Sequence, residues 1–313
     1  MSESPLTELT VLKTAQRRIF AKHEYLGATG SIKDRMVGGV LSRAIAEGSL
    51  KEGMEIVEAS SGNTGAALAA AGAQLGFAVR IFVSSLISVE KTAMIETLGA
   101  SVERVDVSLG LSEIEMAFAY AHDSGAYFFN QFENRHHLQA YKDTLAQELL
   151  GQLESQGIKV DHFVGGVGTG AGIRAVGEML AERHNPELKI WATVPAISPT
   201  DIEGLRPGHL RNEGYFRIWR ERLPGFESAI EHVADADAYW RIFELERLSG
   251  IKVGPASGAY LQVASKLDGI VLVLFTDTGD KYTSKKAAWR ERLHLKSGYI
   301  DCSSAPSDYE HNE

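Results

Sequence analysis

The chain has 313 residues, of which 44% are hydrophobic and 23% are charged, and its formal net charge is −9. Its length allows one large domain or two of ordinary size, and its composition is typical of a soluble globular protein. The acidic balance argues against nucleic acid or an anionic membrane as the main partner. No apolar run approaches the ~20 residues that would span a bilayer.

Cysteine usage and the amino terminus narrow the chemistry and the location. The single cysteine, Cys302, excludes an internal disulfide framework and a metal site built from cysteines. His136 and His137 are neighbours and would point apart on a helix, so we expect no metal site. The amino terminus lacks a basic region followed by an apolar stretch, which makes the cytoplasm the expected location.

The first predicted element is a helix that begins beside a lysine. Residues 27–35 read GATGSIKDR, in which Ser31 and Asp34 have the spacing of a capping box, and apolar residues then recur at helical spacing until Gly48. Lys33 would lie in the first turn, where the helix dipole disfavours an ammonium. If it is also shielded from water, its pKa falls toward that of a reactive neutral amine. The plainer alternative is a solvated lysine near a helix start.

The second predicted segment places hydroxyl and amide side chains at another helix start. An apolar strand at 54–59 leads into SSGNTG at 60–65 and then into an alanine-rich helix ending near Gly76. Free backbone N–H groups and the helix dipole suit this loop to a carboxylate, although a simple N-cap is the alternative. The side chains concerned are those of Ser60, Ser61, Asn63 and Thr64. Further along we expect a strand at 77–83, a helix at 88–98 and a strand at 102–107.

The third segment carries a glycine-rich loop. Val160–Val164 reads as a strand, GGVGTGAG at 165–172 follows it, and a helix to about His184 and a strand at 189–194 come next. Such a loop can surround a phosphate with backbone N–H groups, whereas a plain tight turn needs fewer glycines. The spacing is not G-x-G-x-x-G, no acidic residue ends the next strand, and no G-x-x-x-x-G-K-[ST] occurs. A dinucleotide fold and a nucleoside triphosphate loop are therefore disfavoured.

The last segments repeat the same plan. Ile251–Val253 is read as a strand before GPASGAY at 254–260 and a short helix, and an apolar strand at 270–275 precedes TDTGDKYTS. Residues 199–232 are irregular and resemble a long excursion over a site. Their arginines could bind an anionic leaving group or an acidic second substrate, or could simply be solvated: Arg206, Arg211, Arg217, Arg220 and Arg222.

Alternating strands and helices predict an α/β fold with mostly parallel sheets covered on both faces. We expect two sheets, one from the strands at 54–107 and one from the strands after 160. The three loops would lie at the carboxyl ends of strands, where ligands of such folds gather. A helix-start lysine, a loop suited to phosphate and a loop suited to carboxylate are together what pyridoxal phosphate (PLP) chemistry on an amino acid requires.

Six motifs carry a family resemblance. In their order and approximate spacing the chain resembles the fold-type II PLP enzymes, and within them the cysteine synthase and cystathionine β-synthase group, from about Ser4 to Thr283. The motifs are GSIKDR at 30–35, EASSGNTGAALA at 58–69, NQFENRHH at 130–137, GGVGTG at 165–170, GPASGA at 254–259 and DTGDKY at 277–282.

The resemblance implies a role for each matching residue. Lys33 would hold the cofactor as an internal aldimine and, once released, move the Cα proton of the substrate. Asn63 would also lie near the ring oxygen of the cofactor. Ser60, Ser61, Asn63, Thr64 and Gln131 would bind the substrate carboxylate, and Gly166, Gly168, Thr169 and Gly170 would hold the cofactor phosphate.

The chain departs from the family pattern at several positions. Ala256 stands where a serine usually contacts the pyridine nitrogen, so Ser257 is assigned to that role, with Thr278 as a substitute. Gly172 stands where a second hydroxyl is common, and the usual acidic residue before Pro195 is missing. These differences leave the cofactor assignment in place and leave the leaving group and nucleophile open.

The resemblance further implies two three-layer α/β/α domains of the tryptophan synthase β type and a homodimer. The larger domain would comprise 1–34 and 142–296, the smaller one, 35–141, would close over the substrate, and 297–313 would be a polar, disordered tail. The implied reaction is β-replacement on O-acetylserine, O-phosphoserine or serine through an aminoacrylate, with cysteine from sulfide as default. Alternatives are a cystathionine or diaminopropionate-type synthase, a serine or threonine dehydratase, and a non-catalytic relative.

Overall fold

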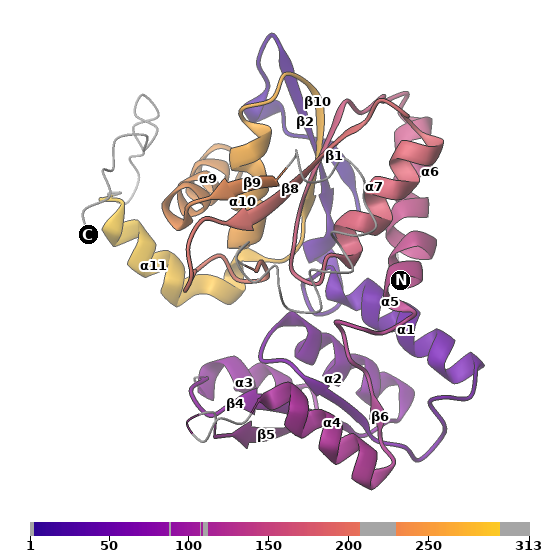
Figure 1. Ribbon diagram of the computed structural model, residues 1–313. Helices are drawn as coiled ribbons and strands as arrows, with labels where there is room; N and C mark the ends of the chain where they lie inside the picture. Colours follow the sequence, from indigo (N-terminus) through magenta and orange to yellow (C-terminus); the bar gives the residue numbers. More distant parts are fainter. Residues whose placement is uncertain (1–2, 88, 107, 109–111, 207–229, 295–313) are drawn as a thin grey trace. The chain divides into compact units, whose positions relative to one another are not determined.

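The computed structural model of the protein describes residues 3–87, 89–106, 108, 112–206 and 230–294 (Figure 1). The chain forms two compact units. Of the described residues, those within Leu26–Gln147 make the first, and those within Ser2–Tyr25 and Glu148–Glu313 make the second. Lys33, which we expected in the larger domain, therefore belongs to the first unit. The predicted closing movement stays a prediction.

The first unit contains a four-stranded parallel sheet in the order β5-β4-β3-β6. Its central strand β3 is buried along its whole length, as expected for a parallel sheet covered on both faces. The strands are β3 (Ile56–Ala59), β4 (Val79–Ser84), β5 (Ser101–Val105) and β6 (Tyr127–Phe128). The described helices are α1 (Lys33–Ala46), α2 (Asn63–Leu75), α3 (Val89–Thr97), α4 (Glu113–Ser124) and α5 (His137–Tyr141), which continues through Lys142–Ala146.

Helix α2 follows β3 directly and packs close to the sheet. A Cβ at Gly72 would lie 2.2 Å from Val79 Cγ2, so only glycine permits this approach. Gly76 ends the helix with a left-handed conformation, at the position that the sequence predicted. The predicted strand, loop and helix over 54–76 are therefore confirmed.

The second unit contains a six-stranded sheet in the order β1-β2-β10-β7-β8-β9, parallel except for the β1–β2 pair. The predicted second sheet is thus confirmed from β7 onward and gains two strands from the amino terminus. The strands are β1 (Leu6–Glu8), β2 (Arg17–His23), β7 (His162–Gly166), β8 (Lys189–Pro195), β9 (Ile230–Val233) and β10 (Gly269–Phe275). The α-helices described in this unit are α6 (Gln147–Ser155), of which only Gln147 belongs to the first unit, α7 (Ala171–Arg183), α9 (Asp235–Ser249), α10 (Pro255–Ala264) and α11 (Thr283–Arg292).

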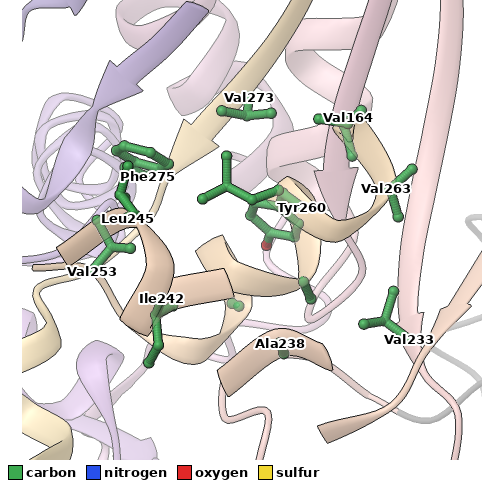
Figure 2. Close-up of a cluster of buried hydrophobic side chains, with 14 of the residues drawn as sticks. Val164, Val233, Ala238, Ile242, Leu245, Val253, Tyr260, Val263, Val273 and Phe275 are labelled. Atoms are coloured by element: carbon green, nitrogen blue, oxygen red, sulfur yellow. The ribbon is translucent and has the colours of Figure 1, made fainter. Parts of the chain in front are cut away.

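The core of the second unit lies where α9 and α10 pack on the sheet. Figure 2 shows Tyr260 of α10 between side chains of the strands and of α9. The labelled members of this cluster are Val164, Val233, Ala238, Ile242, Leu245, Val253, Tyr260, Val263, Val273 and Phe275. Burial of these side chains fixes α10 against the ends of β7 and β10, where the predicted loops lie.

The predicted strand Ile251–Val253 is wrong. Val253 makes an isolated antiparallel bridge with Thr278, and α10 begins at once with Pro255 in its first position. Proline favours the first turn of a helix because its missing N–H would have no intrahelical partner there. No described helix is long and apolar enough to cross a membrane.

A buried polar cluster ties the amino-terminal segment to α6 within the second unit. Lys22 has no exposed surface, and its Nζ donates to Ser4 O at 2.6 Å, to Gln152 Oε1 at 2.7 Å and to the Glu148 carboxylate. A buried ammonium is tolerated only when its hydrogens are bonded in this way. This cluster explains why β2 can carry a lysine on a buried face.

Candidate active site

Lys33 is the first residue of α1, as the sequence predicted, and the Ser31 hydroxyl accepts from its N–H at 3.4 Å, but Asp34 does not complete the predicted capping box. Ile32 occupies the N-cap position without a side-chain cap, and the carboxylate of Asp34 accepts from the Thr29 N–H at 2.9 Å and from the Thr29 hydroxyl at 2.5 Å. Gly30, with φ of 72°, turns the preceding loop back onto Asp34. Asp34 therefore stabilises the loop that leads to Lys33 and does not cap the helix.

The 60–65 loop uses part of its own polar groups for its shape. Ser60 Oγ accepts from the N–H groups of Gly62 at 3.4 Å and of Gly65 at 3.3 Å. Ser61 and Asn63 are half-buried, and α2 begins at Asn63. The first turn of a helix leaves N–H groups without intrahelical partners and carries a positive dipole end. This geometry suits a small carboxylate.

Gln131 connects this loop to the rest of the first unit. Its side-chain oxygen accepts from the Thr64 hydroxyl at 2.7 Å, and its side-chain nitrogen donates to Glu58 Oε1 at 3.3 Å. Its backbone N–H donates to Glu58 Oε2 at 3.0 Å, and its backbone oxygen lies 2.6 Å from His137 Nδ1. The structure thus brings Thr64 and Gln131 into direct contact, and it holds Gln131 with two residues that the sequence analysis did not select as site residues.

The two residues that were missed, Glu58 and His137, are both buried, and the pKa of each is shifted in the direction that favours its neutral form. Burial raises the pKa of Glu58 to about 8, against the opposing effects of its bonds to Gln131 and of the Lys33 charge. Burial, with the Lys33 charge adding to it, lowers the pKa of His137 to about 3. Near pH 7 the surroundings of Lys33 therefore include a protonated carboxyl and a neutral imidazole. A carboxylic residue inside the otherwise apolar strand β3 (Ile56–Ala59) was the available sequence signal.

The glycine-rich loop of the second unit joins β7 to α7. Gly170 has φ of 80° and occupies the N-cap position of α7. A Cβ at Gly168 would lie 2.3 Å from the Gly204 carbonyl oxygen, and one at Gly166 would lie 2.3 Å from the Tyr260 hydroxyl. Glycine is thus required for packing, and the bare backbone at a helix start also fits a phosphate. Thr169 is half-buried on the same turn.

Ser257 lies in the first turn of α10 and has no exposed surface. Its Oγ accepts from the Thr276 N–H at 3.1 Å, which joins α10 to the end of β10. Thr278 caps the following 3-10 helix by accepting from the Asp280 N–H at 3.4 Å. The ring-nitrogen role of Ser257 stays a prediction.

Two expectations concern other parts of the chain. Among the described residues no group of three or more His, Cys, Asp or Glu side chains could hold a metal ion. Of the five arginines, Arg206 is described, and its N–H donates to Val167 O at 2.8 Å. The other four, with Cys302 and the predicted tail from residue 297, lie outside the described residues.

These features define a class of protein: an α/β enzyme with a lysine at a helix start and two strand-to-helix loops suited to small anions. A family model described as "Pyridoxal-phosphate dependent enzyme" matches residues 2–277. The chain belongs to this family, and its cofactor is PLP. The fold class, cofactor and family that the sequence indicated are confirmed.

Several known proteins are similar along almost the whole chain. Cysteine synthase B of Campylobacter jejuni is 31% identical over 290 residues, which is 89% of this chain and 94% of that protein. The O-acetylserine dependent cystathionine beta-synthase from Helicobacter pylori has 26% identity and a TM-score of 0.79, over 90% of this chain and 95% of that one. O-ureido-L-serine synthase has 27% identity and a TM-score of 0.79, over 95% of both chains.

Proposed function

We propose that the protein replaces the β-substituent of an L-serine derivative with a second nucleophile. The observation that carries this proposal is the 60–65 loop at the start of α2, whose Thr64 is held by Gln131 in the same unit as Lys33. A loop suited to an α-carboxylate, in a PLP enzyme of this family, indicates an amino-acid substrate. The names of the similar proteins support O-acetylserine or a related serine derivative, with cysteine from sulfide as the default product.

Each predicted site residue has a proposed part in this reaction. When bound, PLP supplies an aldehyde for an amine and a ring that accepts electron density from the substrate Cα. Lys33 would hold the cofactor and later move the proton at Cα, which its place in the first turn of α1 allows. Ser60, Ser61, Asn63, Thr64 and Gln131 would bind the carboxylate, Gly166, Gly168, Thr169 and Gly170 the phosphate, and Ser257 the ring nitrogen.

The geometry around Gln131 refines its proposed part. Its amide oxygen already accepts from Thr64 and its amide nitrogen already donates to Glu58. We therefore propose that Gln131 contributes to carboxylate binding by orienting Thr64. A cytoplasmic homodimer without nucleic-acid or membrane partners completes the proposal, in line with the acidic net charge of −9.

A second candidate is replacement by another nucleophile, as in a cystathionine-type synthase. The similarity to a cystathionine beta-synthase that depends on O-acetylserine favours this candidate over a dehydratase. The two candidates share the first half of the reaction and differ in the acceptor. Screening sulfide and homocysteine against the same serine derivative separates them.

Reductive trapping tests the cofactor lysine. Purified protein is reduced with borohydride in the presence of PLP and digested, and the modified peptide is identified by mass spectrometry. We expect the adduct on Lys33, its loss in Lys33→Ala and its retention in Lys51→Ala, an exposed lysine of the same unit. An adduct elsewhere, or none in the wild-type chain, overturns the assignment.

Product analysis tests the reaction. O-acetylserine, O-phosphoserine and L-serine are each incubated with enzyme and sulfide, and amino-acid and keto-acid products are quantified. We expect an amino-acid product from at least one of the three. Keto acid from L-serine without any replacement product would instead show a dehydratase.

A further inference from the structure

His137 is buried beside the predicted site and is not explained by the roles assigned so far. It is the first residue of α5 and has 4% of its surface exposed. Its Nδ1 lies 2.6 Å from Gln131 O, whereas its Nε2 is buried without a hydrogen-bond partner in the described chain. A buried polar atom left in this state requires an explanation, because its desolvation is uncompensated.

The bond to Gln131 determines which nitrogen carries the proton. A carbonyl oxygen can only accept, so Nδ1 of the neutral ring is the donor and Nε2 presents a bare lone pair. Because Gln131 is itself fixed by Glu58 and Thr64, the carbonyl cannot turn freely. The Tyr141 ring packs against the imidazole with centroids 5.4 Å apart. The Nε2 lone pair therefore has a fixed direction.

The nearby cation is Lys33. Helices α1 and α5 pack together in the first unit (Figure 1), and they approach so closely that a Cβ at Gly39 would lie 2.7 Å from Ala140 Cβ. Lys33 and His137 are the first residues of these two helices. Burial is the main cause of the lowered pKa of His137, and the positive charge of Lys33 adds to it.

We propose that His137 is a positioning residue for Lys33: when the amine is free of the cofactor, the Lys33 side chain turns so that one of its N–H groups donates to Nε2, which has no partner in the described conformation. The consequence for the reaction rests on the proposed function, because only there must a released lysine be held ready to move a proton. The contact itself requires no cofactor. Its test therefore remains separate from the test of the proposed function.

Two substitutions at His137 distinguish the contributions of its two ring nitrogens. His137→Asn retains a polar group near the Nδ1 position and removes the acceptor at Nε2. His137→Gln places an amide oxygen near the Nε2 position. His136→Asn is the matched control, because the neighbouring His136 contacts Glu47 at 3.1 Å instead. All variants are compared with the wild-type chain by circular dichroism and thermal melting.

The first measurement is the labelling rate of Lys33 in full-length protein freed of cofactor, using isotopic acetic anhydride at one pH and peptide mass spectrometry. An acceptor bonds an ammonium more strongly than an amine, so its removal increases the reactive neutral form. We expect labelling about threefold to tenfold faster in His137→Asn, and near the wild-type rate in His137→Gln and His136→Asn. An unchanged rate in His137→Asn, or an equally raised rate in His137→Gln, overturns the proposal.

The second measurement needs no substitution at His137. The ¹⁵N resonance of Nε2 is followed in cofactor-free wild-type, Lys33→Ala and Lys51→Ala chains. We expect it to move in Lys33→Ala and to stay in Lys51→Ala, and no movement in Lys33→Ala overturns the proposal. Adding PLP separates the two hypotheses: failure of PLP to protect Lys33 from labelling contradicts the proposed function, while the variant rates without cofactor still decide the role of His137.

Discussion

Replacing Gly168 with alanine tests whether the glycine-rich loop is held against a second segment of the same unit. The added Cβ would lie 2.3 Å from the Gly204 carbonyl oxygen, whereas ordinary contacts begin at 3.4 Å, so the two segments must separate by about 1.1 Å. The opposing segment has little freedom to move. Arg206 N–H bonds Val167 O at 2.8 Å, and Asp201 N–H bonds the buried Asp235 carboxylate at 2.7 Å.

The forced separation has two expected effects. Overpacking of this kind costs about 1–3 kcal/mol of unfolding free energy. A displacement of about 1 Å also misaligns backbone N–H groups aimed at a phosphate, and losing about 1.4 kcal/mol or more of that binding weakens PLP affinity by about tenfold or more. Urea unfolding measures the first effect. Titration of cofactor-free protein with PLP, followed by absorbance, measures the second.

Gly151→Ala provides the matched control. Gly151 lies in α6 of the same unit, and a Cβ there would meet nothing within 4 Å. Alanine in a helix interior is expected to stabilise by up to about 1 kcal/mol without altering PLP affinity. Wild-type stability together with wild-type PLP affinity in Gly168→Ala would refute the packing argument.

Three further predictions concern buried ionisable groups. The pKa of Glu58 is raised from 4.5 to about 8, so its contribution to stability is full below pH 4.5 and is lost as pH rises toward about 8. In urea unfolding, the wild-type free energy of unfolding should therefore decline by a few kcal/mol over this range, and Glu58→Gln should remove that decline. A parallel decline in the variant would contradict the prediction. The pKa of His137 is lowered from 6.5 to about 3, so its contribution to stability is full above pH 6.5 and is lost as pH falls toward 3. The free energy of unfolding should therefore fall less steeply with decreasing pH in His137→Asn than in the wild-type chain. Lys22→Met leaves Glu148 without its buried partner and should cost about 3–5 kcal/mol, most of which the double variant with Glu148→Gln should restore.

The elements predicted correctly are those whose signal is local. Strand β3 with α2, and strand β7 with α7, each combine an apolar run, a loop rich in glycine or serine and an alanine- or leucine-containing helix. Such segments specify their own boundaries through turn and capping residues. The alternation of these units was enough to predict two mostly parallel sheets.

The elements that were missed depend on partners far along the chain. Strand β2 reads RRIFAKH, and its lysine and histidine suggest an exposed segment. Both are buried, because Lys22 is bonded by residues of α6 and His23 by the Thr7 hydroxyl at 2.7 Å. The predicted capping box fails at Asp34 for a related reason, since the Asp34 carboxylate bonds Thr29 across the turn at Gly30. Tertiary partners override local propensity at these positions.

The polar residues that support the candidate site can be predicted in part from the sequence. Strand β6 has two residues, and the Gln131 N–H beyond its end bonds the Glu58 side chain instead of a strand carbonyl. A carboxylic residue in a buried strand must be neutralised or hydrogen-bonded, so its presence next to a polar loop already predicts a second polar group there. The sequence does not show which residue supplies this second polar group, because Glu58 and Gln131 are 73 residues apart. The backbone pairing of β3 with β6 places Gln131 beside Glu58. Gln131 then holds Thr64 through its side-chain oxygen and His137 through its backbone oxygen.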